Sequence, residues 1–133
     1  VMSRLSERIE NFNGAFELFD EVRSNFLKDK NNNTFRLALT QGFEIVCELA
    51  WKVLKDYLFV NGISVNLPRD VIKEAFNKEV IQNGQVWIDM ISARNATSHE
   101  YNMDKIDTIL ENISSVYYDE LLNFRNWLRG LDE

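Results

Sequence analysis

The segment from Arg94 to Tyr101 holds the residues of this sequence whose types and spacing could do chemistry. It contains the only histidine, His99, with an arginine five residues before it and a tyrosine two residues after it. An imidazole is the side chain whose unperturbed pKa lies near neutrality, so it can act as a general base or acid. A guanidinium is a planar, permanently charged fork that suits phosphate oxygens. Together the two groups could act on a phosphodiester.

Each of these residues also has an ordinary structural interpretation. A single histidine near a helix end often caps the helix or packs against a neighbour, and Arg94 could simply pair with an acidic residue. On a straight helix, positions 94 and 99 lie about 140° apart around the axis, so Asn95 would share a face with His99 but Arg94 would not. The guanidinium and the imidazole converge only if the helix ends or distorts near Ser98, or if they meet across a dimer axis. The sequence leaves both geometries open.

Cleaving RNA without a metal ion needs three groups, and one chain offers only two of them. A base must take the 2′-OH proton, a cation must stabilise the charge that develops on the phosphate, and an acid must protonate the leaving 5′-oxygen. His99 and Arg94 would supply the first two, but the chain has no second histidine for the third. A two-fold dimer with both motifs facing one cleft would supply it. This chemistry therefore favours a homodimer with its site at the interface.

Charged residues of the second predicted helix form a smaller group of candidates. Glu44, Glu48 and Lys55 follow one side of that helix at steps of four and seven, with Lys52 beside them. One interpretation is a solvated face with a Glu48–Lys52 pair, worth a few tenths of a kcal/mol. The other is that Lys52 and Lys55 line a groove for RNA or a nucleotide.

Five helices are predicted to position these residues. Apolar residues recur every three or four positions over about 3–28, 34–60, 85–99 and 102–128, the pattern of amphipathic helices. Pro68 opens a shorter helix, because its missing N–H costs nothing at the first helical position. The residues expected to be buried include Phe12, Phe16, Phe19, Phe26, Leu39, Phe43, Val46, Ala50, Val53, Val71, Ile72, Ala75, Phe76, Trp87, Met90, Ile91, Leu110, Ile113, Val116, Tyr117, Leu121, Phe124 and Leu128.

The expected fold class is all-α: an antiparallel up-and-down bundle of three long and two shorter helices that forms one domain over residues 1–133. Connections of a few residues favour antiparallel neighbours. The second helix is apolar on more than one side, so it is either central in the bundle or also part of a subunit interface. Trp51, on that helix, is expected in the core or the interface, and Cys47 as inert packing.

Composition excludes several classes of function. The chain has 133 residues, a net charge of −6 and a single cysteine, so an internal disulfide is impossible and tight, sequence-independent nucleic-acid binding is disfavoured. No signal peptide and no membrane-spanning apolar run is visible, and we expect a cytoplasmic protein. No zinc-ligand spacing, glycine-rich phosphate loop or nucleotidyltransferase signature occurs. We expect neither a metal nor a cofactor.

The spacing of Arg94, His99 and Tyr101 matches the RX4HXY motif of HEPN-domain proteins, in particular the HepT-like group. Further blocks resemble the family called nucleotidyltransferase substrate-binding proteins, in the same order along the chain. These blocks are residues 43–44, 48–52, 54–58, 68–76, 86–87 and 94–99. The resemblance covers roughly Leu39 to Tyr101, and no motif residue is missing.

This resemblance implies a helical bundle that dimerises and pairs with a small MNT-type nucleotidyltransferase. In related toxin–antitoxin pairs the HEPN protein is a metal-independent ribonuclease, with Arg94 and His99 in the catalytic positions here. The transferase neutralises it by adding AMP to the motif tyrosine, here Tyr101. We expect substrate contacts from four further residues, namely Asn95, Ser98, Lys52 and Lys55.

An older interpretation of the same family makes the chain a non-catalytic subunit that binds substrate or nucleotide for its transferase. The intact motif favours the enzyme, whereas the acidic balance and the lack of a clear basic groove favour the binding subunit. The sequence leaves whether the chain is an enzyme undecided, and the ribonuclease is our leading interpretation.

Overall fold

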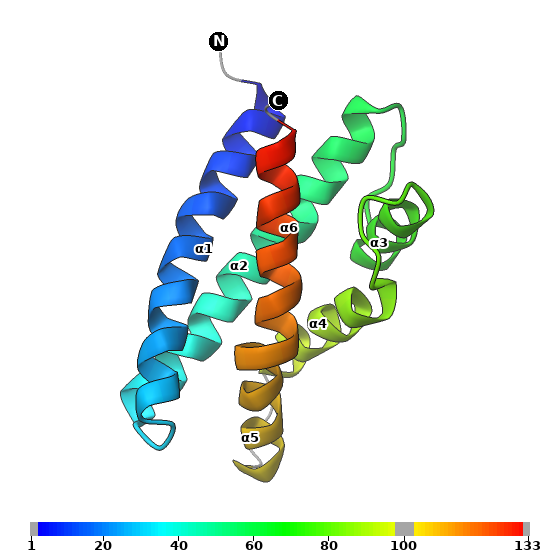
Figure 1. Ribbon diagram of the computed structural model, residues 1–133. Helices are drawn as coiled ribbons and strands as arrows, with labels where there is room; N and C mark the ends of the chain where they lie inside the picture. The colour runs from blue at the N-terminus through cyan, green and yellow to red at the C-terminus, as the bar shows by residue number, and fades with distance from the viewer. Residues whose placement is uncertain (1–2, 98–102, 132–133) are drawn as a thin grey trace.

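The computed structural model describes residues 3–97 and 103–131, and every element in these two ranges is helical. The elements in chain order are α1 (Arg4–Lys28), α2 (Asn33–Val60), α3 (Pro68–Asn77), α4 (Gly84–Thr97), α5 (Met103–Asn112), the π-helical turn η1 (Ile113–Tyr117) and α6 (Tyr118–Gly130). Of these helices, none is both long enough and apolar enough to cross a membrane. α5, η1 and α6 follow one another without a break and form one long helix (Figure 1). The predicted all-α antiparallel bundle of three long and two shorter helices is therefore confirmed for the described residues.

Short polar residues, a proline and a glycine set the helix boundaries. The side chains of Ser3 and Asn32 each accept a backbone N–H of the first turn, at 3.1 Å, and so cap α1 and α2. Pro68 is the first residue of α3, as predicted. Gly62, just after α2, has a φ of +86°, a left-handed conformation that glycine adopts without strain. These local signals are why the predicted boundaries of α1, α2 and α3 agree closely with the structure.

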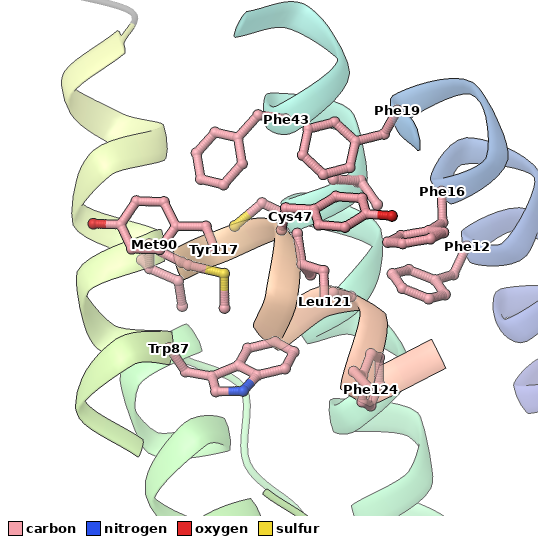
Figure 2. Close-up of a cluster of buried hydrophobic side chains, with 14 of the residues drawn as sticks. Phe12, Phe16, Phe19, Phe43, Cys47, Trp87, Met90, Tyr117, Leu121 and Phe124 are labelled. Carbon is pink, nitrogen blue, oxygen red and sulfur yellow. The ribbon is translucent and has the colours of Figure 1, made fainter. Parts of the chain in front are cut away.

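Aromatic rings from five elements meet in the centre of the bundle (Figure 2). The ring of Phe124 packs edge-on against Phe12 and against Trp87, with centroids 5.2 Å apart in both pairs. Phe43 and Tyr117 stack at 5.7 Å, with their planes 18° apart. Such pairs contribute about 0.5–1.5 kcal/mol each beyond the area they bury. They fix α4, the helix that carries the candidate motif, against α2 and the long C-terminal helix.

Helical periodicity predicts most of the buried positions correctly. The confirmed core residues, each at most 8% exposed, are Phe12, Phe16, Phe19, Phe26, Leu39, Phe43, Val46, Ala50, Val53, Val71, Ile72, Ala75, Trp87, Met90, Ile91, Leu110, Ile113, Tyr117, Leu121, Phe124 and Leu128. Two of the predicted positions are wrong, and each has a physical reason.

Val116, expected in the core, is 48% exposed. The cause is η1, because a π-helical turn holds more residues than an α-helical turn and shifts the pattern that follows. As a result, Tyr117 and its neighbour Tyr118 are both buried. The carbonyl of Ser114, within the widened turn, accepts a hydrogen bond from Arg23 Nε at 2.7 Å. A constant helical period carried through the whole long helix therefore misplaces Val116.

Phe76, also expected in the core, is 49% exposed. The buried side of α3 is occupied by Val71, Ile72 and Ala75, and one further residue turns the chain by roughly 100°. The ring lies against Gly84 at the start of α4, where an added Cβ would be only 3.3 Å from Phe76 Cδ1. Phe76 therefore covers the start of α4 with one side of its ring while about half of the residue remains in solvent.

Candidate functional site

Arg94 lies in the last turn of α4 and faces α2. Its side chain is 38% exposed, and Nη2 lies 3.5 Å from Glu48 Oε2. Nη1 donates to Asn95 Oδ1 at a long 3.4 Å, and Asn95 itself is exposed. Within the described residues, the buried Nε of Arg94 has no hydrogen-bond partner. The guanidinium is thus held at one edge by a carboxylate, and its other contacts to described residues are weak.

Glu48, in the middle of α2, joins three donors. Its carboxylate accepts the indole N–H of Trp51 at 3.0 Å and pairs with Lys52 Nζ at 3.3 Å as well as with Arg94. Burial acts to raise the pKa of Glu48, but the hydrogen bonds from Trp51 and Lys52 and the charges of Arg94 and Lys52 outweigh it and lower that pKa. Glu48 is therefore ionised at neutral pH and holds two cations side by side.

Thr97 connects the end of α4 to α2 through a second carboxylate. Its hydroxyl lies 2.7 Å from Glu44 Oε1 and 2.8 Å from the carbonyl oxygen of Arg94, and its single proton can be donated to one of these at a time. Glu44 and Glu48 stand one turn apart on α2. The two carboxylates together fix the last turn of α4. The spacing of Glu44 and Glu48 in the sequence did not predict this role.

The two candidate lysines lie in different surroundings. Lys52 shares Glu48 with Arg94, which confirms the predicted Glu48–Lys52 pair. Lys55 instead lines a cavity of about 380 Å³ near the start of α1, together with Arg4 and the exposed Phe59. The structure therefore brings Lys52, but not Lys55, next to Arg94.

Three of the candidate site residues, Ser98, His99 and Tyr101, lie outside the described residues. α4 is described as far as Thr97, and α5 begins at Met103 and points in another direction (Figure 1). How positions 94 and 99 lie relative to one another therefore stays a prediction.

A small cavity lies beside Thr97 on the same side of α2. It has a volume of about 340 Å³, and its lining includes Leu37, Ile106 and Ile109. Leu37 is 61% exposed, and Ile45, next to Glu44 on α2, is 54% exposed. The neighbourhood of the candidate site thus offers apolar side chains to solvent on one face of α2.

Cys47, next to Glu48 on α2, is 2% exposed and lies among the buried aromatic side chains (Figure 2). Burial, with a smaller contribution from the charge of Glu48, outweighs the lowering effect of the Arg94 charge and raises the pKa of the Cys47 thiol to about 12. A thiol with that pKa is not a nucleophile at neutral pH, as expected for a packing residue. Within the described ranges, no group of three or more His, Cys, Asp or Glu side chains lies close enough together to hold a metal ion.

The sequence and the fold of this chain are similar to those of known proteins. Residues 7–130 match the family described as nucleotidyltransferase substrate binding protein like. The fold is similar to that of the tri-AMPylated HEPN toxin of Shewanella oneidensis, solved in complex with its MNT antitoxin, with a TM-score of 0.76 and 13% identity over 97% of this chain and 99% of that one. It is also similar to a mutant of the MntA–HpeT toxin–antitoxin, with a TM-score of 0.71 and 12% identity over 95% and 98% of the two chains. No curated protein matches the sequence. The chain belongs to the nucleotidyltransferase substrate-binding-like family and has the fold of the HEPN toxins.

Proposed function

We propose that this chain is the toxin of a toxin–antitoxin pair, a metal-independent ribonuclease that acts as a homodimer in the cytoplasm. In this proposal Arg94 and His99 carry the reaction, and an MNT-type nucleotidyltransferase neutralises the toxin by adding AMP to Tyr101. The family, and the solved HEPN toxins that share the fold and whose complexes contain an antitoxin, support this kind of partner.

The observation that carries the proposal is the state of Arg94. Glu48 holds one edge of its guanidinium, while among the described residues Nη1 has only a long contact to Asn95. A guanidinium that is oriented yet not fully engaged can turn its remaining N–H groups toward a phosphate without first breaking a strong ion pair. Lys52, on the same carboxylate, adds a second positive charge beside the place where the phosphate would lie. Asn95 and Ser98 are the neighbouring groups proposed to contact the substrate.

The proposed reaction uses two copies of His99. The imidazole of one copy accepts the proton of the 2′-OH, the 2′-oxygen attacks phosphorus, and the imidazolium of the second copy donates a proton to the leaving 5′-oxygen. Arg94 stabilises the negative charge that develops on the phosphate oxygens. The exposed Leu37 and Ile45 on α2 support a subunit interface on this face, because burying them in a dimer would remove apolar surface from water.

AMP on Tyr101 would place a phosphodiester charge of about −1 in the motif. Such a group can pair with Arg94 and occupy the position of an RNA phosphate. Inhibition would then need no refolding. We expect the MNT-type nucleotidyltransferase to be encoded near this chain. Intact-mass measurement after co-expression of the two proteins should show a gain in steps of one AMP, and Tyr101→Phe should lose this gain. An unmodified mass together with full neutralisation would mean that the partner inhibits by binding alone.

A second candidate function is a non-catalytic subunit that presents substrate or nucleotide to the transferase. The favouring observation is that Glu44 and Glu48 balance the charges of Arg94 and Lys52, so that this region has little excess positive charge for RNA. In this case the chain would bind the transferase but cleave nothing.

RNA cleavage by the purified chain in EDTA separates the two functions. The ribonuclease should cleave in EDTA, and His99→Ala should lose at least about 100-fold in rate while its circular dichroism stays that of the wild type. Exposed Glu17→Gln serves as a variant that leaves the site untouched. Full cleavage by His99→Ala, or loss of cleavage in EDTA, would contradict the proposed mechanism, and no cleavage by any form would favour the binding subunit.

A further inference from the structure

A third cavity, of about 570 Å³, is lined by residues of α3 and of the first turns of α4. Figure 1 shows α3 beside the beginning of α4, whereas Arg94 is in the last turn of α4. The volume of this cavity is within the range of about 300–1,000 Å³ that small-molecule sites occupy. The residues that line it and that matter here are Arg69, Lys73, Phe76, Gly84, Gln85 and Ile88. None of them takes part in the proposed cleavage reaction.

One wall of this cavity is an aromatic ring. Phe76 is 49% exposed although its α3 neighbours Ile72 and Ala75 are almost fully buried. The ring lies against Gly84 of α4, where an added Cβ would be only 3.3 Å from Phe76 Cδ1. Ile72 and Ile88 add apolar surface to the same cavity. A held, partly exposed ring in such surroundings is suited to stacking with a planar base.

Two cations flank the ring. Arg69 and Lys73 stand one turn apart on α3, both are exposed, and both line the cavity. Across the parts of the chain that the structure describes, neither forms an ion pair. Among the described lining residues Asp70 is the only carboxylate. The cavity therefore has more positive than negative charge, on a chain whose net charge is −6. Unpaired cations beside an aromatic ring fit an anion that carries a planar group.

We propose that this cavity binds a nucleotide, with its phosphate on Arg69 and Lys73 and its base against Phe76. The side-chain Nε2 of Gln85 donates to Asp89 Oδ1 at 2.9 Å. The side-chain Oε1 of Gln85 can then accept a hydrogen bond from an exocyclic amine of the base. The nucleotide can be free or part of an RNA strand, since both offer the same phosphate and base. Binding here does not depend on the cleavage proposed at Arg94.

Calorimetric titration of the full-length chain with AMP, ATP and a short single-stranded RNA tests this proposal. The RNA arm uses His99→Ala so that no cleavage disturbs the measurement. The combined Arg69→Gln and Lys73→Gln variant should weaken binding about tenfold, and Phe76→Leu should also weaken it about tenfold because the ring is lost. The matched control is Lys28→Gln with Arg129→Gln, which changes the net charge equally at exposed positions on α1 and α6.

The ligand series identifies the source of the nucleotide. Binding of AMP or ATP that the cavity variants weaken indicates a free nucleotide, and RNA binding alone that they weaken indicates a strand. Either result supports the proposal if the control variant binds as the wild type does and all variants keep wild-type circular dichroism. No binding of any of the three ligands, or binding that the cavity variants do not change, would overturn it. Glu17→Gln, exposed on α1, should keep AMP and ATP binding, and these two titrations involve no cleavage, so failure of the cleavage proposal is distinguished from failure of this one.

Discussion

The two ends of α4 hold positively charged side chains in opposite ways. At the C-terminal end, Arg94 and Lys52 share the carboxylate of Glu48, and Thr97 contacts Glu44. At the N-terminal end, the cations are Arg69 and Lys73 of α3, which form no ion pair with a described residue and flank an exposed aromatic ring instead. The cations at the C-terminal end of α4 are thus oriented and balanced by carboxylates, whereas those near its N-terminal end form no ion pair with a described residue.

This difference bears on what each end can do. Carboxylates that hold a guanidinium reduce its net attraction for RNA but fix its direction, and stabilising a transition state depends on direction. Unpaired cations on exposed stems attract any phosphate yet orient it poorly, which suits binding without chemistry. We therefore expect variants at the C-terminal end of α4 to change rates and folding stability, and variants at the N-terminal end to change affinity.

The largest effect among the supporting residues is expected for Glu48→Gln. Arg94 and Lys52 would lose their shared negative charge and repel one another, so the rate of RNA cleavage should fall about tenfold and the free energy of unfolding by about 1–2 kcal/mol. Both are measured against Glu17→Gln, an exposed change of equal charge. Wild-type rate and stability in Glu48→Gln would show that this carboxylate does not hold the site.

The same variant has a predicted pH dependence. The pKa of Glu48 in the folded chain is lowered below its ordinary value of 4.5, so the stability it contributes is present above pH 4.5 and is lost as the pH falls through the folded pKa. The stability difference between wild type and Glu48→Gln should therefore shrink as the pH is lowered below 4.5. A difference that grows on acidification would contradict the lowered pKa.

Thr97→Val should produce a smaller effect at the same end of α4. The substitution keeps the branched shape but removes the hydroxyl that lies 2.7 Å from Glu44 Oε1, and we expect a loss of about 1 kcal/mol in the free energy of unfolding. Thr34→Val, at an exposed position in the first turn of α2, is the matched control. Equal stability of the two variants in chemical denaturation would remove Thr97 from the set of residues that fix α4.

Phe76→Leu at the opposite end should have the smallest effect on stability. Because the residue is 49% exposed, its replacement should change the free energy of unfolding by less than about 0.5 kcal/mol, although it weakens nucleotide binding. Denaturation curves of this variant and the wild type should nearly coincide. A decrease of several kcal/mol in the free energy of unfolding would mean that the Phe76 ring mainly stabilises the core and is not there to form a binding site.

The residues that sequence reasoning placed correctly are those whose environment is set by local pattern. Phe12, Phe16 and Phe19 lie on one stripe of α1 and are fully buried, because a helix of constant period must bury its apolar face. The burial of Val116 was predicted wrongly because this residue lies within the π turn η1, which changes the helical period. The burial of Phe76 was also predicted wrongly. Its ring lies against Gly84 of α4, and a local sequence pattern does not encode such a contact between two helices.

The candidate site follows the same division. The motif and the Glu48–Lys52 pair are local in sequence, and both were visible before the structure. The contacts of Glu44 with Thr97 and of Glu48 with Arg94 join α2 to α4 across more than forty residues. They depend on the packing of these helices, so the sequence offered these carboxylates only as part of a charged face.

The most direct test of the central claim compares steady-state RNA cleavage by Arg94→Lys with cleavage by the combined Arg69→Gln and Lys73→Gln variant. If Arg94 acts on the reacting phosphate, lysine cannot replace its fork, and kcat should fall about 100-fold with little change in KM. The combined variant should keep kcat within about twofold of the wild type, since its cations only bind. A wild-type kcat in Arg94→Lys, or a kcat that falls equally in both variants, would contradict the account.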